Sequence, residues 1–379
     1  MSLSTEPLRV LILNERDPLH PNAGGAEIHV HEIFRRLAAR GWPITQMVSR
    51  GRGCSETEVL DDVQLRRLGR IRAYYPRVAW TCMRETRRGD YDVVVECLNK
   101  VPFYSPVYSS VPVVAICHHL FGEVAFQQVA WPIAAAVWSA EQPIPLLYKK
   151  CEVVAISASS RDELIARGLS AERVRVSHCG IDHPDLQVDT DTPRPARVAY
   201  LGRLEPYKNV DVMLRAMAQL SDRFPDAELL VIGRGSARPA LESLARELGI
   251  ADRTRFTGFV SDEERNELLL GTRVCVCPSE KEGWGLTVIE SNATGTPVVA
   301  TDAPGLRDSV RHAETGYLVE TRNVDGFAAR IAELLEDDGL ATRMSREALA
   351  WSKEFDWDLA ADEMADALHD AVQRKPGRS

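Results

Sequence analysis

Two glutamates in the C-terminal half, Glu282 and Glu290, are separated by seven residues that include two glycines and a tryptophan. The pattern after Gly285 predicts a helix over residues 287–294, which places Glu290 about one turn inside that helix and leaves Glu282 on the preceding loop. N–H groups at the start of a helix bind anions, and carboxylates accept hydrogen bonds from hydroxyl groups. A solvated acidic surface would explain the glutamates but not the tryptophan and glycines between them. The stretch therefore fits a ligand that carries both phosphate and sugar hydroxyls.

Two cations, Arg203 and Lys208, lie five residues apart in the stretch 202–209, directly after a predicted strand at residues 197–201. An arginine can bind two phosphate oxygens at once, and a lysine adds a point charge, so the pair suits a pyrophosphate. The alternative is an ordinary pair of surface charges. Their position at the carboxyl end of a strand favours the pyrophosphate site.

Adjacent glycines, Gly24 and Gly25, stand in the stretch from Asn22 to Glu27, between a predicted strand at residues 9–13 and a predicted helix at residues 26–39. Glycines let the backbone approach a ligand closely, and the helix start again offers N–H groups to an anion. A tight strand-to-helix turn explains the glycines equally well. The spacing is not G-x-G-x-x-G, which argues against a dinucleotide-binding site.

Apolar strands alternate with amphipathic helices along the whole chain, except in the polar, proline-containing segment 187–195, which we interpret as a linker. The predicted strands are residues 9–13, 44–48, 63–68, 91–96, 111–117, 152–156, 174–177, 197–201, 228–232, 255–257, 274–277 and 297–300. The predicted helices are residues 26–39, 209–220, 240–248, 262–269, 287–294 and 357–372, with a further helix starting near Ser157 and Ser159. Such alternation is typical of parallel sheets covered by helices on both faces, which bind ligands at the carboxyl ends of their strands.

The composition fits two globular domains, because the chain has 379 residues of which 45% are hydrophobic. A formal net charge of −9 argues against general nucleic-acid binding. The eight cysteines form no C-x-x-C pair, so we expect reduced, buried thiols; Cys275 and Cys277 share a strand face but lack a second pair of metal ligands. Neither a signal peptide nor an apolar run of membrane-spanning length is present, so we expect a soluble, cytoplasmic protein, with attachment to the inner membrane face as the alternative.

Two segments could serve a second substrate. Residues 66–88 contain eight arginines but only one acid, Glu85, together with Tyr74, Tyr75 and Trp80. This stretch fits a membrane surface or an anionic acceptor, but a solvated helix face is favoured. Residues 121–148 are apolar and aromatic, with only Glu123 and Glu141 charged, and their uncharged run at residues 129–138 is too short to span a bilayer, so we expect the segment to pack beside the acceptor cleft.

Taken together, these motifs resemble the retaining glycosyltransferases of family 4, which have the GT-B fold. The resemblance covers nearly the whole chain and also includes residues 295–300 and 316–319. It implies two Rossmann-like, doubly wound parallel-sheet domains that face a cleft: an acceptor-side domain at residues 1–188 and a nucleotide-sugar domain at residues 189–356. The C-terminal helix and tail, residues 357–379, would cross back to the first domain.

The resemblance also assigns roles to individual residues. The residues assigned to the donor diphosphate are Gly24, Gly25, Arg203, Lys208, Leu286 and Thr287. Those assigned to the transferred sugar are Gly283, Trp284 and Gly285, and the backbone N–H groups of Trp284, Gly285 and Leu286 would assist Glu282 there. Glu290 is assigned to the ribose, and Gly258, Phe259 and Val260 to the base. The residues assigned to catalysis are Glu282 and His118.

Two histidines compete for that catalytic position, because His118 and His119 both follow the predicted strand 111–117. Alignment of the strand favours His118. His119 stands where the family often has an acidic residue, which leaves the choice open. A second departure, Ser291-Asn292 where Ala-Met is frequent, is attributed to packing.

The activity implied is transfer of a hexose-type sugar from a UDP- or GDP-sugar to a hydroxyl acceptor, with retention, by a front-face mechanism and without a metal or other cofactor. The acceptor could be a lipid-linked sugar, a glycan or a small natural product. Alternatives are a nucleotide-sugar-binding protein without turnover, and a membrane-peripheral transferase acting on a lipid-linked acceptor. A nicotinamide-dependent oxidoreductase is disfavoured because neither half has the dinucleotide fingerprint.

Overall fold

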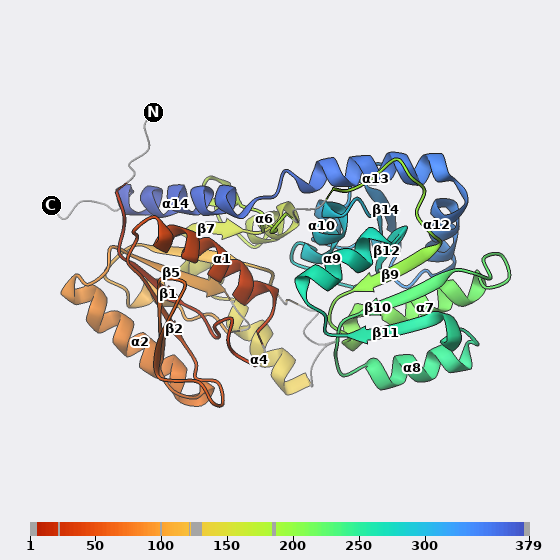
Figure 1. Ribbon diagram of the computed structural model, residues 1–379. Coiled ribbons are helices and arrows are strands. Elements are labelled where there is room, and N and C mark those ends of the chain that lie inside the picture. Colours follow the sequence, from red (N-terminus) through yellow and green to blue (C-terminus); the bar gives the residue numbers. More distant parts are fainter. Residues whose placement is uncertain are drawn as a thin grey trace. The chain divides into compact units, whose positions relative to one another are not determined.

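The computed structural model describes residues 6–21, 23–98, 101–120, 122, 131–183 and 187–374. The chain forms two compact units (Figure 1). Unit 1 consists of Met1–Gly180 and Trp357–Ser379, and unit 2 of Ile181–Asp356. Each unit is an α/β domain built on one twisted sheet.

The sheet of unit 1 has eight strands in the order β3-β4-β2-β1-β5-β6-β7-β8, parallel throughout except for the antiparallel pair β3 and β4. The strands are β1 (Val10–Leu13), β2 (Ile44–Val48), β3 (Thr57–Leu60), β4 (Val63–Arg67), β5 (Val93–Leu98), β6 (Val113–Cys117), β7 (Glu152–Ala155) and β8 (Val174–Val176). The helices are α1 (Gly25–Ala39), α2 (Ile71–Arg88), α4 (Trp131–Glu141), α5 (Ile144–Leu147), α6 (Ala158–Ala166) and α14 (Trp357–Gln373). Ser157 caps α6 by accepting from Ser160 N at 3.1 Å, which confirms the predicted helix start.

The sheet of unit 2 has six parallel strands in the order β11-β10-β9-β12-β13-β14. The strands are β9 (Arg197–Leu201), β10 (Glu228–Ile232), β11 (Thr254–Gly258), β12 (Val274–Cys277), β13 (Val298–Thr301) and β14 (Gly316–Val319). The helices are α7 (Val210–Gln219), α8 (Arg238–Glu247), α9 (Asp262–Leu270), α10 (Leu286–Ala293), α11 (Leu306–Ser309), α12 (Val324–Glu336) and α13 (Asp338–Ser352). The elements from α11 to α13 and the edge strand β14 are additions to the elements predicted from sequence.

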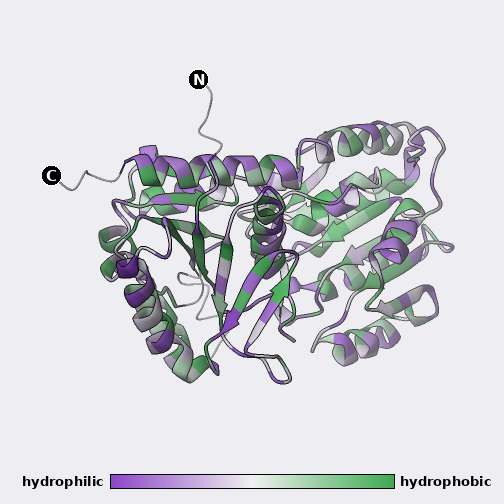
Figure 2. Ribbon diagram, turned by 60° about the vertical axis from the view of Figure 1, so that its left-hand side comes forward, coloured by the Kyte–Doolittle hydropathy of each residue, from purple (hydrophilic) through white to green (hydrophobic). Residues whose placement is uncertain are grey.

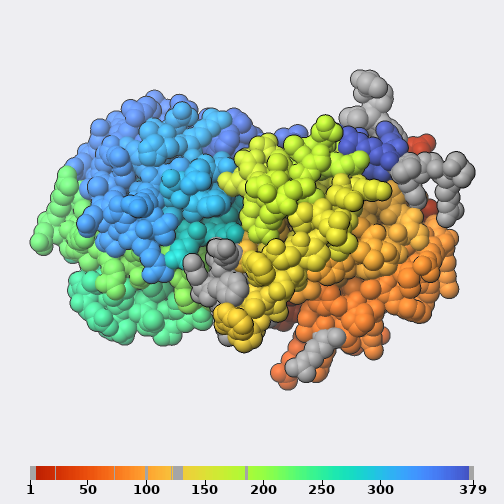
Figure 3. All heavy atoms as spheres, turned by 180° about the vertical axis from the view of Figure 1, so that it is seen from behind, coloured from red at the N-terminus to blue at the C-terminus, as the bar shows by residue number. Residues whose placement is uncertain are grey.

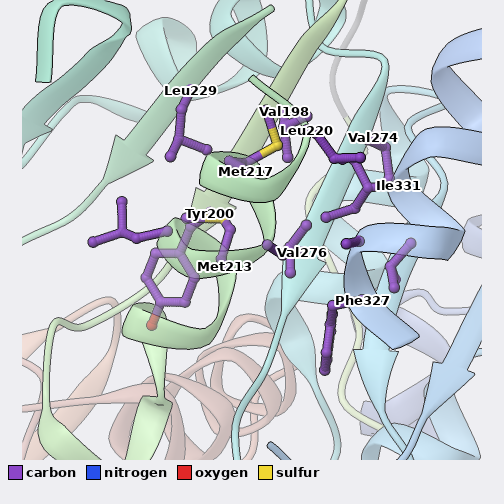
Figure 4. Packing of buried hydrophobic residues seen from close by; sticks show 14 of the residues in the cluster. Val198, Tyr200, Met213, Met217, Leu220, Leu229, Val274, Val276, Phe327 and Ile331 are labelled. Carbon is purple, nitrogen blue, oxygen red and sulfur yellow. The ribbon is translucent and has the colours of Figure 1, made fainter. Parts of the chain in front are cut away.

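Helices cover both faces of the sheet in unit 2, as the doubly wound prediction requires. One core packs β9 and β12 against α7 and α12 and includes Tyr200, Met213 and Phe327 (Figure 4). The core on the opposite face includes Cys275 and Cys277 together with side chains of α9, α10 and α11. Strand side chains alternate between the two cores because successive residues of a strand point to opposite faces. The ribbon in Figure 2 accordingly shows hydrophobic strands between helices whose outer sides are hydrophilic.

The C-terminal helix α14 belongs to unit 1 and lies beside α1 (Figure 1). Its buried face includes Trp357, Ala361 and Met364. Arg40, at the end of α1, pairs with Asp358 of α14 at 3.1 Å. The last helix of the chain therefore completes the core of the first unit.

The segment 187–195, interpreted above as a linker, lies in unit 2 and is packed against it. Arg194 donates to Thr296 Oγ1 at 2.8 Å and to Thr294 O at 2.6 Å. Asp189 accepts from the backbone N–H of Asp191 at 2.8 Å, which makes the Asp-x-Asp sequence a local turn.

No helix in the described part of the chain is long and apolar enough to cross a membrane. The structure describes all eight cysteines, and each is a free thiol; Cys54 is half-buried and the others are buried.

Candidate functional site

The two predicted phosphate-binding cations lie on the loop that follows β9. Leu204 N donates to Arg234 O at 2.9 Å, and Ala237 N donates to Leu204 O at 2.9 Å, so this loop is held against the loop after β10. The contact leaves no room for a side chain, because a Cβ added to Gly233 would lie 1.9 Å from Gly202 O. Two loops locked in this way hold Arg203 in place at the carboxyl end of the sheet.

Lys208 and Glu282 meet directly: Lys208 Nζ donates to Glu282 Oε1, although the two residues are 74 positions apart in the sequence. The side chains of Lys208 and Glu282 are 13% and 18% exposed, so most of the ion pair is buried, but a small part of it lies at the surface, where a ligand could reach it. Burial lowers the pKa of Lys208, but the charge of Glu282 leads the effects that outweigh it, and the net pKa is raised. The structure thus brings together a residue predicted for the diphosphate and one predicted for catalysis.

No side chain that the structure describes caps the N–H groups at the start of α10. Gly285 is the residue before the helix, has a φ of +93° and makes no side-chain cap. A Cβ at this position would come within 2.6 Å of Ser309 Oγ, so only glycine fits. The first N–H groups of a helix have no partner inside it, so those of Leu286 and Thr287 are available to an anion.

The side chain of Trp284 points into the core, so only its backbone is accessible to a ligand. Its side chain is 2% exposed and packs edge-on against Phe355, with the ring centroids 5.0 Å apart. The indole therefore anchors the loop of residues 283–285 to the core of unit 2. The predicted contacts of Gly283, Trp284 and Gly285 with a sugar remain a prediction for their N–H groups.

Glu290 lies on α10 and has a partner that the sequence did not indicate. Arg265 Nη1, on α9, donates to Glu290 Oε1 at 3.2 Å. Burial raises the pKa of Glu290, and Arg265 opposes that shift by favouring the charged carboxylate. The only sequence signal for Arg265 is its place in the helix that follows the predicted base segment.

The predicted base segment closes β11 and turns sharply at Gly258, which has a φ of +80°. Gly233 N donates to Gly258 O at 2.9 Å and so ties this turn to the loop after β10. Phe259 is 76% exposed, and the guanidinium of Arg234 lies 5.3 Å from its ring centroid. Val260 packs against the core beneath. An exposed ring beside a cation offers a flat surface to an aromatic base.

In unit 1, the predicted glycine pair opens helix α1. Gly24 N donates to Glu27 Oε2 at 2.7 Å, which caps the helix. A Cβ added to Gly25 would meet nothing within 4 Å, so neither the backbone nor the packing requires a glycine there. A glycine in open space is consistent with close approach of a ligand. Asn22, from the same motif, lies outside the described residues.

His118 follows β6 directly, is 6% exposed, and contacts a second buried histidine. His118 Nε2 lies 3.0 Å from His29 Nδ1, on α1. Burial lowers the pKa of His118 to about 3. His119 is half-buried beside it. Sequence spacing did not reveal the partner, because His29 and His118 are 89 positions apart.

The arginine-rich stretch 66–88 divides between structural pairs and an exposed face. Arg66 binds both oxygens of Glu85, at 2.7 and 3.0 Å, and Arg67 forms a buried pair with Asp17 at 2.7 Å. The outward side of α2 carries Arg77, Trp80, Arg84 and Arg88, and the Arg84 guanidinium lies 4.4 Å from the Trp80 ring centroid.

The predicted apolar segment 121–148 is described only in part, since residues 121 and 123–130 lie outside the described ranges. Its helix α4 lies at the surface of unit 1 (Figure 3). Trp131 and Trp138 of this helix are 72% and 40% exposed.

Among the described residues, no three histidine, cysteine, aspartate or glutamate side chains are grouped so that they could hold a metal ion. The candidate site of unit 2 consists of cations, carboxylates and helix N–H groups around the ends of β9, β11 and β12. Unit 1 separately contains the glycine pair and the two buried histidines.

Both units match known glycosyltransferase sequences. Residues 187–351 match the family described as Glycosyl transferases group 1, and residues 23–184 match Glycosyltransferase Family 4. The D-inositol 3-phosphate glycosyltransferase of Streptomyces avermitilis is 34% identical over 58% of this chain, a match that spans 52% of that relative's length. The protein of the same name from Streptomyces scabiei is 27% identical over 98% of this chain and 94% of its own.

Solved structures share the fold. Sucrose-phosphate synthase from Thermosynechococcus elongatus has a TM-score of 0.77 and 22% identity over 94% of this chain and 97% of its own. The Anabaena protein HepE, in complex with UDP-glucose, has a TM-score of 0.72 and 18% identity over 95% and 99%. The family matches cover most of both units and the fold agrees with them, so the chain belongs to the family 4 glycosyltransferases of the GT-B fold.

Proposed function

We propose that the protein transfers a hexose-type sugar from a UDP- or GDP-sugar to a hydroxyl acceptor, with retention of anomeric configuration and without a metal ion. The observation that carries this proposal is the grouping in unit 2 of Lys208 with Glu282, next to the uncapped start of α10. A cation, a carboxylate and free N–H groups match a sugar diphosphate in charge and in hydrogen-bonding capacity.

Donor binding would require an exchange of partners, since Lys208 donates to Glu282 in the structure. Lys208 would turn to the diphosphate, and the Glu282 carboxylate would then accept hydrogen bonds from the sugar. Glu290 would exchange Arg265 for the ribose hydroxyls in the same way. After the exchange, both carboxylates would still accept hydrogen bonds from hydroxyl groups, Lys208 would face the diphosphate, and Arg265 would keep its pair with Asp262.

In the chemical step, the bond between the anomeric carbon and the phosphate oxygen breaks and its electron pair leaves with the nucleoside diphosphate. Negative charge grows on the diphosphate, where Arg203, Lys208 and the N–H groups of Leu286 and Thr287 would stabilise it. Positive charge grows on the sugar near Glu282. These groups supply the charge stabilisation that a bound metal gives in other transferases.

Retention follows if the acceptor attacks from the face that the diphosphate leaves. The acceptor oxygen forms the new bond to the anomeric carbon, and the departing phosphate oxygen takes the acceptor's proton, so atoms and charge balance. No carboxylate of the described residues is assigned as a covalent nucleophile.

The acceptor is proposed only as a hydroxyl compound. The names of the relatives make a phosphorylated cyclitol a reasonable member of an acceptor panel. Lipid-linked sugars and glycans belong in the same panel.

The test is a panel of UDP- and GDP-sugars incubated with these acceptors in the presence of EDTA, with mass spectrometry for product and for slow donor hydrolysis. NMR of the product reports its anomeric configuration. We expect transfer or hydrolysis of at least one donor, with retention. Binding without turnover would favour a nucleotide-sugar-binding protein instead, an inverted product would refute the front-face step, and dependence on added metal would refute metal independence.

A further inference from the structure

Two buried histidines of unit 1 form a closed pair. His29 Nδ1 and His118 Nε2 are 3.0 Å apart, and the rings meet edge to face with centroids 5.0 Å apart. His29 is 1% exposed and His118 is 6% exposed. Burial lowers the pKa of both imidazoles, most strongly through desolvation, so both are neutral near pH 7.

Because both imidazoles are neutral, a single proton lies between His29 Nδ1 and His118 Nε2. One nitrogen must donate and the other accept, because a neutral imidazole carries one N–H. The tautomer of His118 is therefore set by the tautomer of His29. Within the described residues, His118 Nδ1 has no hydrogen-bond partner, which leaves it as the nitrogen of this ring that can meet a ligand.

The His29 ring also lies near a buried tryptophan. Its centroid lies 6.0 Å from that of Trp357, the first residue of α14. Trp357 is 3% exposed, so it is a fixed part of the core of unit 1. His29 thus contacts both His118 and a buried aromatic ring of the core.

The arrangement is a poor way to gain stability. His29 Nε2 and His118 Nδ1 are buried, and neither has a hydrogen-bond partner among the residues the structure describes. Burying polar atoms without partners is unfavourable, and two apolar rings would fill the same space without that penalty. Because the pair is unfavourable for stability and holds the His118 ring in one orientation, we expect that ring to have a functional role.

We propose that His29 is a positioning residue for His118: it holds the ring and sets its tautomer, so that Nδ1 is the nitrogen presented to a ligand. This inference rests on the proposed function and on the catalytic role that the family resemblance assigns to His118. His29 itself would touch neither the donor nor the acceptor.

The test compares three variants. His29→Phe keeps the ring that packs on Trp357 but removes the nitrogen. His29→Asn places an amide near the position of Nδ1 and can restore the hydrogen bond. His31→Phe is the matched control, because His31 is on the same helix, is 7% exposed, and bonds to Asp61 at 2.7 Å instead of to His118.

Steady-state kinetics gives the first readout. We expect His29→Phe to lower kcat about 10- to 100-fold, the range for a misplaced catalytic group, with the KM for the donor within about twofold of wild type. His29→Asn should recover most of that loss, and His31→Phe should leave kcat within about twofold. Equal losses in His29→Phe and His31→Phe, or no recovery in His29→Asn, would overturn the proposal.

Nitrogen NMR of the 15N-histidine-labelled protein gives the second readout and does not depend on turnover. The His118 signals are assigned by their loss in His118→Asn. We expect one protonated and one unprotonated nitrogen in the wild type, and averaged shifts from exchanging tautomers in His29→Phe. Identical His118 shifts in the two proteins would refute the link between the rings. Failure of the proposed function would appear separately, as a wild-type protein that shows this link but transfers no sugar.

Discussion

Replacing Arg203 with alanine should separate the function of this residue from the stability of the fold. Arg203 is exposed and donates from Nη2 to Tyr207 Oη at 3.1 Å. An exposed hydrogen bond of this kind contributes about 0.5–1 kcal/mol, so the free energy of unfolding should fall by no more than about 1 kcal/mol.

The expected loss in catalysis is several times larger. A cation about 4 Å from a phosphate near a protein surface interacts with about 4 kcal/mol. Removal of one donor that stabilises developing negative charge lowers the rate by about 10²–10³, which corresponds to about 2.7–4 kcal/mol. We therefore expect Arg203→Ala to lose that much in kcat/KM for the donor.

The assay combines kcat/KM, measured with a saturating acceptor, with thermal unfolding of the same preparations. Arg223→Ala is the matched control, because Arg223 is an exposed arginine of the same unit that pairs with Glu336. We expect the control to match wild type in kcat/KM. Near-wild-type turnover in Arg203→Ala, or equal losses in the two variants, would refute the assignment of Arg203 to the diphosphate.

Three further predictions concern the ion pair, the glycines and the buried histidine. Lys208→Met and Glu282→Gln should each lower the free energy of unfolding by about 1–3 kcal/mol in urea, and the double variant by less than the sum. Gly25→Ala should keep the wild-type Tm, because the added Cβ enters open space, but should lose turnover, because that space is where we expect the donor to approach. Gly285→Ala should lower the Tm, because the φ of this residue is +93°. The pKa of His118 is about 3 in the folded protein, whereas an unfolded histidine titrates near 6.5. Below pH 6.5 the unfolded state therefore gains a proton that the folded state does not, and the free energy of unfolding falls by about 1.4 kcal/mol per pH unit. When Tm is measured between pH 7 and pH 4, it should therefore fall less steeply with pH in His118→Gln than in the wild type.

Each of these has a result that contradicts it. Strict additivity in the double variant would show that Lys208 and Glu282 do not interact. Full activity in Gly25→Ala would remove this glycine from the donor site. An unchanged pH slope in His118→Gln would show that the imidazole does not gain a proton on unfolding.

The sequence was sufficient for the parts of the fold that depend on periodicity. Alternating strands and helices are legible locally, and the start of α10 was indicated by Gly285 and the apolar residues after it. The helix α12 has the same kind of signal, since Phe327, Ile331 and Leu334 recur at helical spacing and are buried. The same criterion would have predicted it.

Contacts between distant elements were beyond the reach of spacing. Arg265 meets Glu290 because α9 and α10 pack on the same face of the sheet, and His29 meets His118 because α1 lies near the end of β6. Such pairs depend on how helices rotate and shift when they pack, and the one-dimensional pattern does not encode this. Candidate site residues could be named from the sequence, whereas the partners that contact them, Arg265 and His29, could not.

The most direct test of the donor site is calorimetric titration of UDP- and GDP-sugars into the protein with EDTA present, repeated with Lys208→Met and Glu290→Gln. The account predicts that the wild type binds at least one donor under these conditions and that each substitution weakens binding by about tenfold or more, since each removes a charge-assisted hydrogen bond to the donor. Binding of equal strength in all three proteins, or no binding of any nucleotide sugar, would contradict it.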